Sequence, residues 1–288
     1  MKKTIKNDSL LKNLTKLWDA LLLYFPSAYG GWENRQLWQN INTYCLFIGY
    51  SRSGHSLIGA LLNAHPNIVI AHELNDLKYT YLGFRRWQLY HLLLDKAKLG
   101  VNPNDKSGGY NYDVPNQWQG KFTQILVIGD KKGEGTTLKI EDSPLFLQRL
   151  RKIINVKIKF IHIIRNPYDN ITTMSKKNLK LDFHLSKSIE YYFFLCNIVN
   201  EFKKTLKSDE IYELKYELFI ENPKVYLEEI CNFLGVSTTK SYLEDCANIV
   251  YKFPNKSRYS IVWTSELIEE VQNRINHYSF LHGYNYND

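Results

Sequence analysis

The sequence is poor in sulfur-containing residues and has no long hydrophobic run. Its 288 residues include four Cys and two Met, and no two cysteines form a Cys-x-x-Cys pair. A disulfide framework and a cysteine-ligated metal site are therefore not expected. The first apolar cluster, Leu17 to Phe25, contains Asp19 and ends at Pro26; it is too short to span a membrane and lacks a small-residue cleavage site. These absences predict a cytoplasmic protein without a membrane span.

Acidic residues are also scarce relative to basic ones. The chain carries 29 Asp and Glu against 37 Lys and Arg, a formal charge of +8. This excess suits an anionic ligand, but it is spread through lysine-rich helices, where charges are usually solvated. We therefore expect no nucleic-acid partner. The length is that of one α/β domain with a sizeable core.

Strand-like runs alternate with helix-like runs, which predicts a parallel sheet covered by helices. We expect a three-layer α/β/α fold with a central, mainly parallel sheet of the P-loop nucleotide-binding type, formed by a single domain over residues 1–288. Residues 100–120, rich in Asn, Gly, Pro and Asp, are expected to form an irregular insertion or lid. The expected strands are Tyr44–Ile48, Ile68–Ile70, Ile125–Ile128, Lys157–Ile164 and Glu210–Leu214, and the expected helices are Ser56–Ala64, Pro144–Ile154, Pro167–Lys177, Ser186–Leu206, Pro223–Leu234 and Glu266–Tyr278.

Residues 45–56 read as an apolar strand, a glycine-flanked turn and the start of an amphipathic helix. Gly49 and Gly54 have the Gly-x-x-x-x-Gly spacing of a phosphate-binding loop, but His55 stands where the lysine of that motif would be. Backbone N–H groups and the helix N-terminus favour an anion at such a turn, and Arg52 adds a planar cation that can hold two oxygens. A tight turn with a serine cap is the structural alternative. The other side-chain donors at this locus are Ser53, His55 and Ser56.

A second apolar strand, Phe160–Ile164, also ends at the start of a helix. Arg165 follows the strand, Asn166 can cap the helix, and Pro167 suits its first position. Arg165 is therefore expected at the carboxyl edge of the sheet, where open α/β folds bind ligands. A structural ion pair with a nearby carboxylate is the alternative role for this arginine.

Together the two loops resemble the cofactor loops of the sulfotransferases that use 3′-phosphoadenosine 5′-phosphosulfate (PAPS). Arg165 and Thr173 keep the family's spacing of eight residues between an Arg and a hydroxyl residue, with Thr in place of the more usual Ser. The resemblance continues through residues 214–218 and 222–235, although Leu218 stands where the family has an acidic residue. It implies that Arg165 and Thr173 contact the 3′-phosphate of PAPS. It also implies that the phosphosulfate is held by Arg52, Ser53, Gly54, His55 and Ser56.

The resemblance implies further site residues. A late loop of the family folds over the cofactor, and Ser257 and Arg258 lie where that loop is expected. A lysine that polarises the leaving phosphate is expected at Lys131 or Lys132, and we assign this catalytic role to Lys132, with Arg52 as a second catalytic cation. Exposed basic turns are the alternative reading of both segments. The implied reaction releases adenosine 3′,5′-bisphosphate (PAP) and requires no metal.

Glu73 is the candidate general base. It follows His65 by eight residues, in a run that resembles the branch containing the tyrosylprotein sulfotransferases, where a Glu at this spacing is the base. His72 is the rival base, and an ordinary surface role is the alternative for both residues. His72 and Asn75 replace an acidic residue and an arginine of that branch, so the resemblance does not assign peptide tyrosine as the acceptor.

The sequence thus predicts sulfuryl transfer from PAPS to a free hydroxyl or amine of an acceptor, with a glycan, a lipid, a phenol and a peptide all left open. One alternative is a kinase-like P-loop phosphotransferase that uses ATP and Mg²⁺; His55 disfavours it, although Ser56 could still ligate Mg²⁺. The other alternative is an inactive relative that binds an anion or a glycan. No oligomeric state is predicted.

Overall fold

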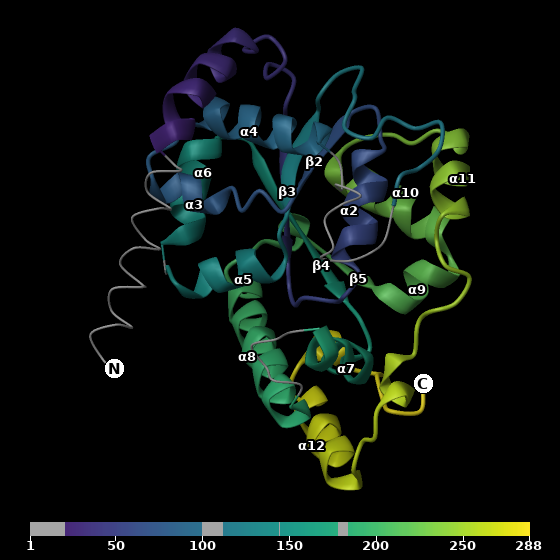
Figure 1. Ribbon diagram of the computed structural model, residues 1–288. Helices are drawn as coiled ribbons and strands as arrows, with labels where there is room; N and C mark the ends of the chain where they lie inside the picture. The colour runs from purple at the N-terminus through teal and green to yellow at the C-terminus, as the bar shows by residue number, and fades with distance from the viewer. Residues whose placement is uncertain (1–20, 100–111, 144, 178–183) are drawn as a thin grey trace.

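The computed structural model describes residues 21–99, 112–143, 145–177 and 184–288. Five parallel strands form its central sheet, in the order β2-β3-β1-β4-β5 (Figure 1). Helices cover both faces of this sheet, which confirms the predicted three-layer α/β/α fold. The strands are β1 (Thr43–Ile48), β2 (Ile68–His72), β3 (Val127–Lys131), β4 (Lys157–Ile164) and β5 (Ile211–Lys215).

The helices begin with one whose described part covers residues 21–33. Those that follow in chain order are α2 (His55–Asn63), α3 (Leu77–Tyr81), α4 (Arg86–Lys98), α5 (Glu134–Glu141), α6 (Phe146–Ile154), α7 (Pro167–Lys177), α8 (Leu185–Lys203), α9 (Tyr216–Glu221), α10 (Pro223–Leu234), α11 (Lys240–Asn248) and α12 (Ser265–Ile275), with a short 3-10 helix, η3 (Ser257–Ser260), before α12.

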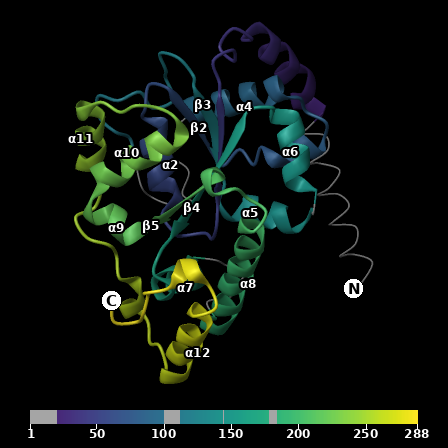
Figure 2. The same cartoon turned by 180° about the vertical axis from the view of Figure 1, so that it is seen from behind.

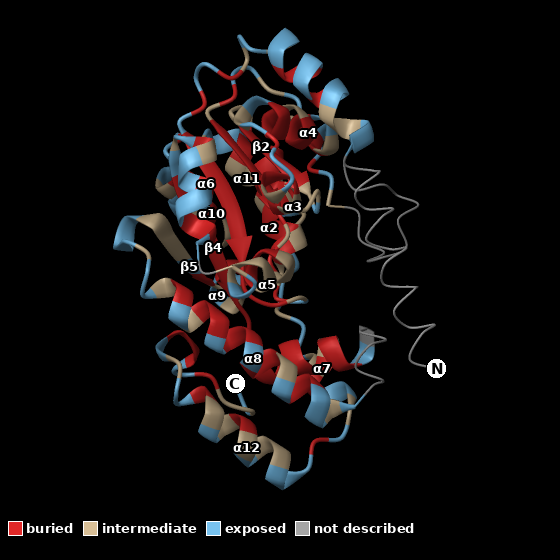
Figure 3. Ribbon diagram, turned by 90° about the vertical axis from the view of Figure 1, so that its left-hand side faces the viewer, coloured by how far each residue is buried: buried red, intermediate tan, exposed pale blue. Residues whose placement is uncertain are grey.

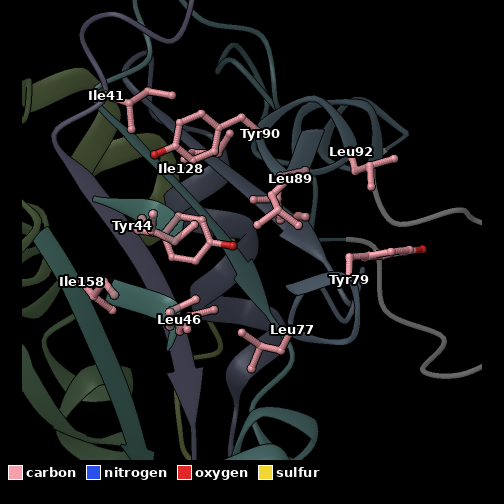
Figure 4. Packing of buried hydrophobic residues seen from close by; sticks show 14 of the residues in the cluster. Ile41, Tyr44, Leu46, Leu77, Tyr79, Leu89, Tyr90, Leu92, Ile128 and Ile158 are labelled. Atoms are coloured by element: carbon pink, nitrogen blue, oxygen red, sulfur yellow. The ribbon is translucent and has the colours of Figure 1, made fainter. Parts of the chain in front are cut away.

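The central strand β1 is buried along its whole length because both faces of the sheet are covered. Successive residues of β1 enter different clusters: Tyr44 packs with residues of α4 and α6, whereas Cys45 packs with residues of α2 and α10. Figures 1 and 2 show α10 and α11 on one side of the sheet and α6 on the other. Figure 3 shows β2 and β4 as mostly buried and the edge strand β5 as mostly intermediate, and Figure 4 shows the cluster around Tyr44.

A third cluster lies beyond the carboxyl edge of the sheet. It joins α7, α8 and α12 to the C-terminal segment that contains Phe280 and Tyr284. The loops after β1 and β4 reach this same edge, so the site predicted from them lies between the sheet and the third cluster (Figure 1).

The third strand differs from its prediction. It begins at Val127 and runs to Lys131, so that Gly129 and Asp130, both poor strand formers, lie inside it. Pairing with both β1 and β2 overrides local propensity here, and a side chain at Gly129 would lie 1.9 Å from the Cys45 carbonyl oxygen. As a result Lys131 is a strand residue and not part of an exposed turn.

Several helices were not predicted, namely residues 21–33, α3, α4, α5, α9 and α11. Of the segment 100–120, residues 100–111 lie outside the described part, and residues 112–120 contain no helix or strand. The backbone of Trp118 and Gly120 donates to the last turn of α2, at Ala64 and Asn63. Within the described ranges, no helix is both long enough and apolar enough to cross a membrane.

Candidate active site

The turn between β1 and α2 has the backbone of an anion-binding loop. Gly49, Arg52 and Gly54 all have positive φ angles, of 120°, 69° and 107°, and the Ser53 hydroxyl donates to the Tyr50 carbonyl at 3.0 Å. A Cβ atom at Gly54 would lie 2.5 Å from the Tyr216 ring, so glycine is required by space as well as by φ. The free N–H groups of the first turn of α2 are thereby presented at the carboxyl edge of the sheet.

The side chain of His55 stabilises this loop through contacts inside it. Its imidazole is buried, with Nε2 3.1 Å from the Ile48 carbonyl oxygen and Nδ1 3.2 Å from the Ser53 hydroxyl. Burial lowers the pKa of His55 to about 3, so the ring is neutral at physiological pH. The group that His55 can offer to an anion is therefore its backbone N–H and not a charged side chain.

Arg165 connects the two loops. It follows β4, the residue as a whole is 7% exposed, and its guanidinium donates to the Arg52 carbonyl oxygen at 3.1 Å and to the Asn255 carbonyl oxygen at 2.6 Å. It also reaches the hydroxyls of Thr173 at 3.4 Å and Ser257 at 3.2 Å, which lie 2.9 Å from each other. The structure thus brings Arg165 and Thr173, which the resemblance assigned to the 3′-phosphate, together with Ser257, which it assigned to the loop over the cofactor.

Within the described part of the chain, Arg165 forms no ion pair with a carboxylate. The nearby Asp169 is paired with Arg258, at 3.3 Å, and Arg165 stacks instead on the Tyr216 ring, with its guanidinium carbon 5.7 Å from the centroid. A buried cation whose hydrogen-bond partners are all neutral costs free energy unless an anion joins it. The surroundings of Arg165 therefore suit a bound anion.

Arg258 has other partners. It is buried against Asp169, and its guanidinium donates to the carbonyl oxygens of Asn285 at 3.1 Å and Asp288 at 2.9 Å. Its backbone N–H also donates to Asp169 at 2.8 Å. These contacts fasten η3 to α7 and to the C-terminal segment. A direct cofactor contact by Arg258 stays a prediction.

Glu73 lies just after β2 and is held by two lysines. Its carboxylate accepts from Lys131 Nζ and from Lys132 Nζ, each at 2.8 Å. Partial burial alone would raise the pKa of Glu73, but the two ammonium groups outweigh it and lower the pKa to about 2. Glu73 is therefore ionised at neutral pH, and its basicity is set by how closely the lysines approach.

Lys131 is the cation that links Glu73 to the loop. Its side chain is buried and packs against α2 beside Gly59. Its ammonium group donates to the Ser56 hydroxyl at 3.1 Å. Lys132, which was assigned the catalytic role, is partly exposed, and its ammonium contacts Glu73. The predicted strand ended at Ile128, so it gave no reason to distinguish the two lysines. In the structure the strand continues to Lys131, which pairs with His72 of β2.

The conformation of the β2–α3 loop depends on Asp130. Glu73 has φ 59° and Asn75 has φ 60°, both in the left-handed region that costs non-glycine residues free energy. Asp130 compensates by accepting three backbone N–H bonds, from Leu74 at 3.0 Å, Asn75 at 2.7 Å and Asp76 at 3.3 Å. Beneath it, the Tyr44 hydroxyl donates to the Asp76 carboxyl, and burial raises the pKa of both carboxyls.

His72, the rival base, lies beside the same lysine. It lines a small cavity of about 40 Å³ together with Lys131. Burial and the positive charge of Lys131 lower the pKa of His72 to about 4, so its imidazole is neutral at physiological pH. Both candidate bases therefore lie at one end of β2. Among the described residues, no group of three His, Cys, Asp or Glu side chains is placed to hold a metal ion.

The comparisons with known proteins agree on one family. A sequence profile of the sulfotransferase family matches residues 46–240. The sulfotransferase domain from the Synechococcus PCC 7002 olefin synthase superposes with a TM-score of 0.52 at 17% identity, over 82% of this chain and 94% of that one. The sulfotransferase domain from the curacin biosynthetic pathway superposes with a TM-score of 0.53 at 16% identity, over 82% of this chain and 96% of that one. No curated protein sequence matches significantly.

The structural similarity establishes the fold, and the profile establishes the family. The matched segment begins in β1, ends at the first residue of α11, and includes the loops that carry Arg52, Glu73 and Arg165. Because this segment is more than half of the chain, the protein belongs to the sulfotransferase family and is a sulfotransferase enzyme.

Proposed function

We propose that PAPS is the sulfuryl donor and that its two anionic ends bind at the two loops. The observation that carries this proposal is the buried guanidinium of Arg165, which has neutral partners and no carboxylate ion pair in the described ranges. Arg165, Thr173 and Ser257 would hold the 3′-phosphate. Arg52 and the N–H groups at the start of α2 would hold the phosphosulfate, since the Arg52 side chain is exposed at the turn.

We further propose that Glu73 is the general base. It would accept the proton of an acceptor hydroxyl while the acceptor oxygen forms its bond to sulfur. The bond between sulfur and the bridging oxygen breaks in the same step, and the electron pair stays on the phosphate. Lys131 lies between Glu73 and Ser56, so it is placed to stabilise this developing charge. When the lysines turn toward the donor, they hold Glu73 less closely and its pKa rises, which makes it a better base.

The acceptor is proposed only by chemical class, as a molecule with a free hydroxyl or amine. Kinship with the tyrosylprotein branch stays a prediction. We also propose that the chain forms one sulfotransferase domain, because the three core clusters share the strands of a single sheet or pack on its edge. A cytoplasmic location is proposed because Cys45, Cys196, Cys231 and Cys246 are all buried as free thiols.

Calorimetric titration with PAP tests the donor site, with ATP and Mg²⁺ as comparator. We expect metal-independent binding of PAP that Arg165→Ala weakens by about 2 to 4 kcal/mol, the cost of losing a buried charge-assisted contact. Arg274→Ala is the matched control, since Arg274 is paired with Glu190 on the surface. Unchanged PAP affinity in Arg165→Ala would refute the assignment, and a preference for ATP with Mg²⁺ would refute PAPS as the donor.

A further inference from the structure

The described helix over residues 21–33 carries an arc of exposed apolar side chains. Phe25 is 76% exposed and Trp32 is 56% exposed; Figure 3 shows much of the outer surface of this helix as exposed. The opposite side packs closely on α4, because a Cβ atom at Gly31 would lie 2.7 Å from the Trp87 carbonyl oxygen. Helical periodicity places the exposed apolar residues on one side. They are Leu21, Leu22, Phe25, Tyr29 and Trp32.

A cationic cavity borders this arc. It has a volume of about 750 Å³, is open to solvent, and lies between Ala28 of the same helix, α3, the start of α4 and α6. No Asp or Glu lines it, and within the described part of the chain none of its four basic side chains forms an ion pair with a carboxylate. Unlike the lysines at Glu73, these charges remain available to an external anion. They belong to Arg85, Arg86, Arg149 and Lys152.

Tyr81 supplies a second sign of an incomplete site in this cavity. Its hydroxyl is buried and has no hydrogen-bond partner among the residues that the structure describes. Arg149 lies over its ring, with the guanidinium carbon 5.1 Å from the centroid, and Lys139 approaches the same ring at 5.7 Å. Buried hydroxyls are usually hydrogen-bonded, so an anionic ligand with acceptor oxygens would satisfy Tyr81 and the neighbouring cations together.

We propose that the apolar arc and the cationic cavity form one docking face for a membrane surface that contains anionic lipids. The arc would enter the boundary between headgroups and acyl chains, where Trp, Tyr and Phe side chains are stable. The cavity would receive a lipid phosphate, and the surrounding Arg and Lys would be attracted by the negative surface potential. A free anion would account for the cavity but leaves the exposed aromatic side chains without a role, so the lipid surface explains both features.

Cosedimentation of the full chain with vesicles tests this proposal. With vesicles of about seven parts phosphatidylcholine to three parts phosphatidylserine, we expect binding at least about tenfold tighter than with phosphatidylcholine alone, and weakened by salt. The double variants Phe25→Ser/Trp32→Ser and Arg149→Ala/Lys152→Ala should each reduce binding by about fivefold or more. The control is Phe253→Ser/Val262→Ser, which removes apolar side chains that are 80% and 88% exposed on another segment and should bind as the parent protein does.

Several outcomes would overturn the proposal. Equal binding to neutral and anionic vesicles would refute the role of the cavity, and full binding by Phe25→Ser/Trp32→Ser would refute the role of the arc. Inorganic phosphate that binds through Arg149 without any vesicle binding would identify a free-anion site instead. A dimer in sedimentation velocity that Phe25→Ser/Trp32→Ser dissociates would identify a second copy as the partner. Arg165→Ala should leave vesicle binding unchanged, so this test is independent of the donor site.

Discussion

Two buried arginines near the site differ in what surrounds them. Arg258 forms an ion pair with Asp169 at 3.3 Å and donates to backbone carbonyls. Arg165 is also buried, but among the described residues it donates only to carbonyl and hydroxyl groups and lies over the Tyr216 ring. The two buried arginines therefore differ in whether a carboxylate of the described residues is paired with them. One arginine is ion-paired with a carboxylate of the protein, and the other forms no such ion pair with the described residues.

Replacement of the single residue Glu73 by Gln tests its proposed role as the general base. Gln cannot accept the acceptor proton, so we expect kcat to fall by about 10²- to 10⁴-fold, while PAP affinity changes little because Glu73 binds lysines and not the donor. Steady-state rates and PAP titration measure the two effects. His72→Gln is the matched control on the adjacent residue. A larger loss of kcat in His72→Gln than in Glu73→Gln would reverse the assignment.

His55 makes a second prediction, on stability and pH. Its pKa is about 3 in the folded protein, against an ordinary value of 6.5, so the unfolded chain binds a proton in this interval that the folded chain does not. Stability therefore falls as pH drops below 6.5, by about 1.4 kcal/mol per pH unit from this group. Urea unfolding at several pH values should show a smaller slope for His55→Gln than for the parent protein. Equal slopes would show that the imidazole is not buried as described.

At the scale of elements, the loop between β2 and α3 is shaped by the neighbouring strand. Asp130 of β3 holds three successive N–H groups of this loop, and the next residue, Lys131, binds Glu73 within it. One strand thus fixes both the backbone and the charge environment of the candidate base. The sequence around Glu73 carries no signal of this environment, because Asp130 lies 55 residues after Asn75, whose N–H it accepts.

Asp130→Asn should disturb this arrangement. Both carboxyl oxygens accept backbone N–H bonds, so either orientation of an Asn side chain sets its NH₂ group against a donor. We expect a loss of about 1 to 3 kcal/mol in the free energy of unfolding, and a fall in kcat with a shifted pH–rate profile because Glu73 moves relative to its lysines. Asp142→Asn is the control, since Asp142 is exposed and paired with Lys139. An unchanged pH–rate profile would show that Asp130 acts on stability alone.

At the scale of the whole molecule, the third core cluster closes the site from outside the sheet. Phe280 and Tyr284 pack with α7, α8 and α12, and Tyr284 donates to Glu217 at 2.7 Å. Glu217 in turn accepts the backbone N–H of Asn166, next to Arg165, at 2.8 Å. The segment near the C-terminus therefore supports the loop that carries Arg165, although more than a hundred residues separate the two segments in sequence.

Arg258→Met tests this long-range support. It leaves Asp169 buried without its cation, and we expect a loss of about 3 to 5 kcal/mol in the free energy of unfolding. The double variant Asp169→Asn/Arg258→Met removes both charges and keeps an acceptor for the Arg258 backbone N–H, so it should recover much of that loss. Urea denaturation measures both. A double variant no more stable than Arg258→Met would show that the ion pair is not what the single change disrupts.

The sequence by itself determined the parallel sheet, the glycine-flanked turn after β1 and the arginine after β4. These features depend on local patterns: apolar runs of strand length, glycines at fixed spacing, and helix starts marked by Asn166 and Pro167. It also pointed correctly to the sulfotransferase family, because the residues that carry the resemblance lie in short contiguous motifs. The same local patterns missed α4 and α5, whose weak amphipathicity leaves little periodic signal.

Only the tertiary structure decided which charges are free. Lys131 is buried because β3 pairs on both sides, His55 turns inward because Gly133 leaves room for its ring, and Arg258 is neutralised by a carboxylate from α7. The cationic cavity likewise gathers residues of four helices. Burial and ion pairing depend on groups distant in sequence, and a residue's charge environment is therefore set by the packing of the whole fold and not by its own motif.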